Sequence, residues 1–503
     1  MTERPIGTFC LVLHSHLPWL AHHGSWPVGE EWLYQAWAHS YLPVTDLLYR
    51  LAERGRRDVL TLGVTPVLAA QLDDPYCLRG CHAWLGDWRL RADYAATRWH
   101  GRWPADPALQ ALAAAEHRAA DHALDRFETR WRHGFSPVLR PLVDDGVVEL
   151  LGGPATHPFQ PLLDPRIRRF ALRTGLADTA LRLGAAPAGI WAPECGYTPG
   201  IEHDYARAGV HRFLVDGPAL HGRTSAARPV GTTDVVCFGR DLEVTYRVWS
   251  PKAGYPGSPA YRDFHTWDHP SGLKPARVTG RNVPPEAKKP YEPELAQATV
   301  TRHVADFTDA VVERLREAQD RDGRPGLVVA AYDTELFGHW WHEGPAWLLG
   351  VLDALPEAGV RVTTLRGALD AGHLGPPVEL PASSWGSGKD WRVWDGEQVA
   401  DIVDAGAVVQ RELLSTVDAH VGTLRDPVAD DMVRAALLAL SSDWAFMVTK
   451  DSAADYARRR AADHGTRFAE LSAAVRNGNT VSATPDRPFG HLDSRWLRKD
   501  SDR

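Results

Sequence analysis

Cysteine is scarce in this chain. The five cysteines are scattered through 503 residues, and their number is odd. This pattern argues against a disulfide framework and predicts reduced thiols in a cytoplasmic protein. Cys77, Cys81 and His82 are close in sequence, but a single trio of this kind is a weak zinc signal, and we expect no metal there.

Long apolar runs are also missing. No stretch reaches the roughly 18 apolar residues that a membrane-spanning helix needs, so no membrane partner is expected. The N-terminus shows no basic segment followed by an apolar run and a cleavage signal, so no secretory signal is expected. The net charge is −8 with both signs interspersed and no basic stripe, which argues against a nucleic-acid partner. No Gly-x-Gly-x-x-Gly follows a predicted strand, so a dinucleotide site is not supported.

Tryptophan, in contrast, is abundant. The chain has 20 tryptophans within an otherwise ordinary globular composition of 44% hydrophobic and 24% charged residues. Many of them must belong to the core, but flat apolar faces also suit a protein that binds rings.

Short apolar runs alternate with helical patterns along most of the chain. This alternation predicts a parallel sheet with right-handed crossovers, and seven strands favour an α/β barrel, closed or incomplete, over a Rossmann sheet. The predicted strands are residues 8–13, 59–64, 147–152, 188–192, 211–216, 327–331 and 360–365.

Three segments depart from this rhythm. Residues 82–140 have helical spacing and predict a helical insertion. Residues 217–300 predict a hairpin, turning near Gly239 and Asp241, followed by a Gly/Pro-rich loop of a length that is usually functional. From residue 396 the pattern is almost wholly helical. We therefore predict a catalytic barrel domain over 1–395 and a C-terminal helical domain over 396–503.

Polar residues follow several predicted strands. His14 and His16 end the first strand, His157 follows the third, Glu194 the fourth and Asp333 the sixth. In α/β barrels the loops after the strands form one face, where active sites lie, so we expect these side chains to converge. The alternative is that each is satisfied locally, with a buried tryptophan cluster after Asp333.

The residue types suggest carbohydrate chemistry. Glu194 and Asp333 could flank a glycosidic bond, and carboxyl groups about 5 to 5.5 Å apart would permit a retaining mechanism. The three histidines would bind hydroxyls and influence the carboxyl pKa values. Trp385 and Trp394 could stack on successive glucosyl rings.

Two other classes of protein remain open. His-x-His with a further His, an Asp and a Glu could bind a divalent metal, as in a metal-dependent polysaccharide deacetylase. Against this, no Asp closely follows the His pair, and the tryptophans are then unexplained. A carbohydrate-binding protein without catalysis is the third class, and the paired acids argue against it.

Five segments in order carry a family resemblance: HSHLPW at 14–19, GGPATHPFQPLL at 152–163, GIWAPECGY at 189–197, AAYDTELFGHWWHEGP at 330–345 and SSWGSGKDWRVW at 383–394. Together they resemble glycoside hydrolase family 57, most closely its α-1,4-glucan branching enzymes. The fourth segment is highly specific on its own. Segments 248–265 and 441–447 also resemble the branching enzymes, and the match covers nearly the whole chain.

The resemblance implies an incomplete (β/α)7 TIM-like barrel with a helical insertion and a C-terminal all-helical domain. It implies a cytoplasmic monomer or homodimer that acts on an α-1,4-glucan by a retaining mechanism without metal or cofactor. Glu194 falls on the family's nucleophile and Asp333 on its general acid/base. The substrate-binding residues that we expect are His14, His16, Trp19, His157, Arg262, His339, Trp340, Trp385, Trp394 and Asp443.

Two departures bear on the reaction. Branching members carry a tyrosine on a loop after the fifth strand that is thought to favour transfer, and residues 218–232 contain none. Pro275 and Ala276 stand where those members tend to have an aromatic residue. Amylase-like hydrolysis or 4-α-glucanotransfer is therefore the alternative to branching, because water that reaches the glycosyl-enzyme hydrolyses it.

Overall fold

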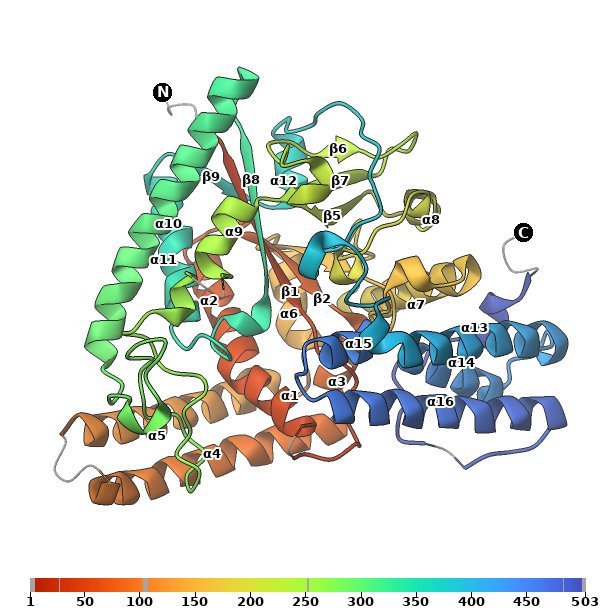
Figure 1. Ribbon diagram of the computed structural model, residues 1–503, viewed down its shortest axis with the longest axis horizontal. Helices are drawn as coiled ribbons and strands as arrows, with labels where there is room; N and C mark the ends of the chain where they lie inside the picture. Colours follow the sequence, from red (N-terminus) through yellow and green to blue (C-terminus); the bar gives the residue numbers. More distant parts are fainter. Residues whose placement is uncertain (1–4, 27, 103–106, 251–252, 483, 500–503) are drawn as a thin grey trace.

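The computed structural model describes residues 5–26, 28–102, 107–250, 253–482 and 484–499 (Figure 1). The predicted insertion at 82–140, the predicted excursion at 217–300 and the segment 248–265 include residues outside these ranges, as do the outer ends of both predicted domains. Within the described residues, no helix combines the length and the apolar character needed to cross a bilayer.

A parallel sheet forms the centre of the molecule. Its strands run in the order β7-β5-β4-β3-β2-β1-β8, and each pairs in parallel with its neighbour. They are β1 (Thr8–Ser15), β2 (Leu60–Val64), β3 (Val148–Gly152), β4 (Gly189–Ile190), β5 (Arg212–Asp216), β7 (Val236–Arg240) and β8 (Leu327–Asp333).

The sheet curves into an incomplete barrel. The amide of Asp241, just after β7, donates to the carbonyl of Val329 in β8 at 2.8 Å, which brings the two ends of the path together. Within the described part of the chain no strand ladder joins β7 to β8, so the ring is not closed by sheet pairing. The fold class predicted from the sequence is confirmed.

Both faces of the strands are buried, which explains their nearly continuous apolar sequences. In β1, Phe9 and Leu11 belong to the large core shared with the surrounding helices, whereas Cys10 and Val12 belong to a separate cluster with Val329 and other residues. Successive side chains of a strand point to opposite faces, so one short run supplies both cores.

Helices follow the strands and cover the barrel (Figure 1). Their ends carry local signals: α7 begins with Asp164, whose side chain accepts the amide of Arg166, followed by Pro165, and ends at Gly184 in the left-handed conformation (φ 75°). The helices are α1 (Glu30–Ala36), α2 (Leu42–Glu53), α3 (Pro66–Leu72), α6 (Ser136–Asp144), α7 (Pro165–Leu183), α8 (Ile201–Arg207), α9 (Leu242–Val248), α10 (Pro293–Asp322), α11 (Gly344–Glu357) and α12 (Leu365–Asp370).

Two further groups of helices flank the barrel. The first is a long pair, α4 (Pro75–Arg102) and α5 (Pro107–Arg126), drawn in orange at the lower left of Figure 1. The second, drawn in blue at the right, comprises α13 (Ala400–His420), α14 (Pro427–Ala439), α15 (Ser442–Thr449) and α16 (Ala454–Asn477). Of these four, α15 carries Asp443, whose carboxylate contacts His16 just beyond β1 at 3.0 Å.

Two predictions about the strands are wrong. The predicted hairpin is one strand, β7, followed by the helix α9, because Asp241 accepts the amide of Val244 at 3.2 Å and caps the helix. The β-branched residues of α9 imitate a strand pattern. The predicted strand at 360–365 is reduced to β9 (Arg361–Thr363), which pairs with the start of β1 beside the main path, while β6 (Arg228–Pro229) pairs antiparallel with β7.

Asp241 gives a test of this arrangement. Its buried carboxylate also accepts Arg314 Nε at 2.8 Å and the Thr224 hydroxyl at 3.2 Å. We expect Asp241→Ala to lower the free energy of unfolding by about 2–4 kcal/mol, because the helix cap and a partly buried ion pair are both lost.

Asp241→Asn is the matched control, since asparagine caps helices as well as aspartate does and only the ion pair is lost. The decrease in the free energy of unfolding of Asp241→Asn, measured by urea unfolding, should be smaller than that of Asp241→Ala. Equal stability of the wild type and Asp241→Ala would contradict the capped helix.

Candidate active site

A cavity of about 1120 Å³ lies where the strands end. Its wall includes residues that follow β1, β3, β4, β7 and β8, together with residues of α15. Nine of the predicted site residues line it: His14, His16, His157, Glu194, Asp333, His339, Trp340, Trp385 and Asp443. Residues from distant parts of the sequence therefore meet in one place.

Three predicted substrate-binding residues lie outside this wall. Trp19 is 2% exposed and donates its indole N–H to Asp486 at 2.8 Å, and Trp394 is 1% exposed and stacks on Phe159 with ring centroids 4.7 Å apart. Both indoles are covered by tertiary packing, which leaves no exposed face for the substrate contact predicted for Trp19 or for the stacking on a glucosyl ring predicted for Trp394. Arg262 lies in a smaller side pocket of about 60 Å³, where it is paired with Glu116 at 2.5 Å.

Glu194 is held in an unusual backbone conformation. It lies in a short turn, Pro193–Cys195, and has φ 62°, while Cys195 has φ 49°. Residues other than glycine rarely adopt a positive φ, and backbone strain of this kind is typical of functional sites. The Glu194 carboxylate accepts two hydrogen bonds, one from Trp385 Nε1 to Oε2 at 2.8 Å and one from the Ser442 hydroxyl to Oε1 at 2.9 Å.

Burial raises the pKa of Glu194 to about 7. The indole of Trp385 opposes this shift by donating to the charged form, the charge of Asp443 adds to it, and the Ser442 hydroxyl again opposes it. The carboxyl group can therefore change its protonation state near neutral pH.

Asp333 is the last residue of β8 and is opposite His14 in the register with β1. Burial and then the charge of Glu194 raise the pKa of Asp333 to about 7, while the charges of His16 and Arg240 act against this. Two carboxyl groups that repel one another in a buried site do not both ionise readily, so near neutral pH the pair favours one proton. A nucleophile must be ionised and a general acid must be protonated, so a pair of carboxyl groups that holds one proton can supply both.

The three histidines form a stacked group over Trp191. The rings of His16 and His157 have centroids 3.7 Å apart, and His14 stacks on Trp191 at 4.3 Å. Burial and then the neighbouring imidazoles lower the pKa of His14 and His157 well below the usual value. Neutral imidazoles of this kind can exchange hydrogen bonds with sugar hydroxyls.

The geometry does not favour a metal at this group. His16, His157 and Asp443 offer ligand atoms within 4.8 Å of one another. A metal ion lies in the plane of each imidazole that coordinates it, and two rings stacked at an interplanar angle of 22° cannot both direct lone pairs at one tetrahedral ion. Asp443 already accepts from His16 at 3.0 Å and from the Ser441 hydroxyl at 2.6 Å. The metal-dependent alternative therefore has no suitable ligand set here.

Several residues of the site were not predicted. Ser442 begins α15 and has no sequence signal of its own. Glu335, two residues after Asp333, is buried and accepts from the Tyr41 hydroxyl and, at 3.0 Å, from the amide of His16. Burial and then the charge of Asp333 raise the pKa of Glu335 to about 8.

Tyr246 and Trp249, in and just after α9, also line the cavity. They were not predicted as site residues because the sequence pattern of this segment predicts a hairpin. Residues 218–232, where a site tyrosine is expected from the resemblance, do not line the cavity and instead bond to residues 373–378, as in Gly231 N to Val378 O at 3.0 Å. Tyr246 places one aromatic hydroxyl in the cavity wall, on the helix that follows β7.

The chain is similar to known proteins along nearly its whole length. Residues 10–371 match the model of glycosyl hydrolase family 57, and residues 408–496 match the C-terminal part of 1,4-alpha-glucan branching enzymes. A probable 1,4-alpha-glucan branching enzyme of Mycobacterium tuberculosis is 59% identical over 517 aligned residues, covering 98% of both chains. The predicted family resemblance is confirmed.

Solved structures share the fold. The crystal structure of a GH57-type branching enzyme from Pyrococcus horikoshii is 30% identical, with a TM-score of 0.91 over 98% of this chain and 97% of that one. The α-amylase AmyC of Thermotoga maritima is 24% identical, with a TM-score of 0.86 over 98% of this chain and 99% of that one. The second likeness concerns the fold alone.

The raised pKa of Glu335 predicts a pH dependence of stability. The group is protonated in the folded state up to about pH 8 but only up to about pH 4.5 when unfolded, so its contribution to stability is present below pH 4.5 and is lost as the pH rises to 8. Glu335→Gln is neutral throughout. Between pH 5 and pH 8 the free energy of unfolding of Glu335→Gln should rise by about 3 kcal/mol relative to that of the wild type.

Urea unfolding at both pH values measures this difference. Glu243→Gln, which alters a carboxylate with 63% side-chain exposure, is the control and should parallel the wild type. If the free energy of unfolding changes with pH equally in Glu335→Gln and in the wild type, the raised pKa of Glu335 is contradicted.

Proposed function

We propose that this chain, which belongs to glycosyl hydrolase family 57, is a 1,4-α-glucan branching enzyme with a retaining mechanism. It would cleave an α-1,4 linkage and transfer the released chain to form an α-1,6 branch. The observation that carries the proposal is the pair of buried carboxyl groups, Glu194 and Asp333, from different strands in one aromatic-lined cavity. The identity to the mycobacterial relative supports the choice of transfer.

In the first step Glu194 Oε attacks the anomeric carbon while Asp333 gives its proton to the departing glycosidic oxygen. A glycosyl ester forms on Glu194, and the leaving chain takes the proton. In the second step the ionised Asp333 removes the proton of an acceptor 6-hydroxyl, whose oxygen attacks the anomeric carbon and releases Glu194. The pKa values near 7 suit these exchanges, because one carboxyl group must begin ionised and the other protonated.

The walls of the cavity suit a glucan chain. At about 1120 Å³ the cavity is larger than most small-molecule pockets, which occupy roughly 300–1000 Å³. Aromatic faces can stack on successive glucosyl rings, and the histidines can bind hydroxyls. The aromatic residues in its wall include Trp26, Trp32, Tyr246, Trp249, Trp340 and Trp385.

The proposal includes the setting of the enzyme. It would act in the cytoplasm, as a monomer or a homodimer, on an amylose- or glycogen-like α-1,4-glucan. All five cysteines are buried and free, which accords with a reducing compartment.

The product of the reaction tests the proposal directly. After incubation of amylose with the enzyme, a debranching enzyme should release new short chains, since it cuts α-1,6 linkages that the substrate lacks. Chain lengths are read by chromatography, and untreated amylose is the control. A rise in reducing ends without debranchable chains would establish amylase-like hydrolysis, and longer linear chains without branches would establish 4-α-glucanotransfer.

The roles of the carboxyl groups are tested by amide substitutions. Glu194→Gln and Asp333→Asn should each lower kcat by about 1000-fold or more, because each removes a group that makes or breaks a bond. Folding is checked by circular dichroism. Glu243→Gln, at an exposed carboxylate, should keep normal activity. Either active-site variant within tenfold of the wild type would refute its assigned role.

A further inference from the structure

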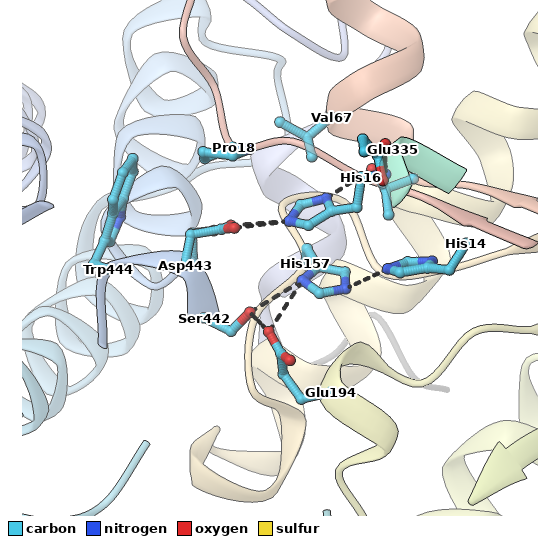
Figure 2. A network of polar contacts seen from close by, with 12 residues as sticks. His14, His16, Pro18, Val67, His157, Glu194, Glu335, Ser442, Asp443 and Trp444 are labelled. Atoms are coloured by element: carbon cyan, nitrogen blue, oxygen red, sulfur yellow. Dashed lines mark hydrogen bonds and ion pairs between the residues drawn. The ribbon is translucent and has the colours of Figure 1, made fainter. Parts of the chain in front are cut away.

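The proposed nucleophile is held from two directions. Trp385, in the barrel domain, donates to Glu194 Oε2 at 2.8 Å, and the Ser442 hydroxyl lies 2.9 Å from Oε1. Ser442 is the first residue of α15, in the C-terminal helical region, and is 3% exposed. Figure 2 shows its hydroxyl between Glu194 and His157, whose Nδ1 lies at 3.0 Å.

The direction of these hydrogen bonds follows from the proton count. An ionised carboxylate only accepts, so the single Ser442 proton goes to Glu194. His157 must then carry its proton on Nδ1 and donate to the Ser442 oxygen. Neutral His157 accepts at Nε2, so His14 Nε2, at 3.2 Å, is the donor. The His14 Nδ1 atom is left as an acceptor, and it has no partner among the described residues.

We propose that Ser442 is a positioning residue for Glu194, at the end of a one-way hydrogen-bond chain that runs from His14 through His157. The inference rests on the proposed role of Glu194 as the nucleophile. With a donor on each oxygen, the plane of the carboxylate is fixed toward the anomeric carbon, and its charged form is stabilised. The C-terminal helical region thereby supplies part of the catalytic site.

The first turn of α15 is itself firmly held. The amide of Ser442 donates to the carbonyl of His157 at 3.1 Å, and Ser441 forms a β-bridge with Pro158. The next residue, Asp443, accepts from His16 at 3.0 Å and from the Ser441 hydroxyl at 2.6 Å. Contacts from the loops after β1 and β3 therefore clamp this turn on both sides of the Ser442 hydroxyl.

Removal of the hydroxyl should change the titration of Glu194. The Ser442 hydroxyl stabilises the ionised form of Glu194 by donating to it. Without this donor the pKa of Glu194 rises, and the acidic limb of the kcat profile moves to higher pH. A hydrogen bond to a charged group corresponds to a shift of about one pH unit. The charged and titratable groups that line this cavity with Glu194 are His14, His16, Glu31, His157, Arg240, Tyr246, Tyr332, Asp333, Glu335, His339, Lys389, Asp443 and Lys450.

The test compares kcat and KM over pH for three variants on amylose. Ser442→Ala should lower kcat about 10–100-fold with KM within about twofold, and move the acidic limb up by about one unit. Ser442→Thr, which keeps the hydroxyl, should restore the position of the limb. Thr449→Val is the matched control, because it removes a hydroxyl of the same helix that bonds to the Val393 carbonyl outside the cavity.

Nitrogen-15 NMR of labelled histidine gives a second readout. His157 should be the Nδ1–H tautomer in the wild type and in Ser442→Thr. A native circular-dichroism spectrum for Ser442→Ala with an unmoved acidic limb would overturn the inference, whatever happens to its thermal stability. So would an Nε2–H tautomer of His157 in the wild type. If Glu194→Gln stays active, the proposed function fails first, whereas an inactive Glu194→Gln with normal Ser442→Ala refutes this inference alone.

Discussion

The burial of two carboxyl groups in one cavity is the constraint on which this structure depends. Glu194 and Asp333 share a cavity that raises the pKa of both to about 7. Burying such groups without compensation is costly, because the charged forms lose their hydration. The chain compensates at Glu194 with two donors, at Asp333 with the positive potential of His16 and Arg240, and by letting the pair keep one proton.

The supporting groups come from separate parts of the chain. Trp385 follows the barrel strands, Ser442 and Asp443 begin α15, and His16 follows β1. Each contact joins elements more than 190 residues apart in sequence, as in the pair Glu194 and Trp385 with a separation of 191. The wall of the cavity is consequently formed by the barrel and the C-terminal helices together. Loosening of either would release the carboxylate from one of its donors.

Hydration of the site is the other determinant of the reaction. Transfer to a sugar requires that the glycosyl ester meets an acceptor hydroxyl before it meets water. In this chain the wall after β7 is the helix α9, with Tyr246 41% exposed and Trp249 38% exposed at the cavity. These rings and Trp340, whose ring centroid lies 5.9 Å from that of Trp249, give the cavity wall an apolar surface on this side. Residues 218–232, which lack the tyrosine that the resemblance leads us to expect, do not line the cavity.

The sequence by itself determined the parallel barrel and the convergence of Glu194, Asp333, His14, His16 and His157. These conclusions depend on local patterns: apolar runs form buried strands, and the residues after parallel strands must meet on one face. Only the tertiary structure decided which tryptophans face the cavity, since Trp19, Trp394 and Trp385 have equivalent local signals but different neighbours. The same holds for α9, because a buried aspartate cap overrode the strand-like pattern, and for Ser442, because its role arises from a contact 248 residues away.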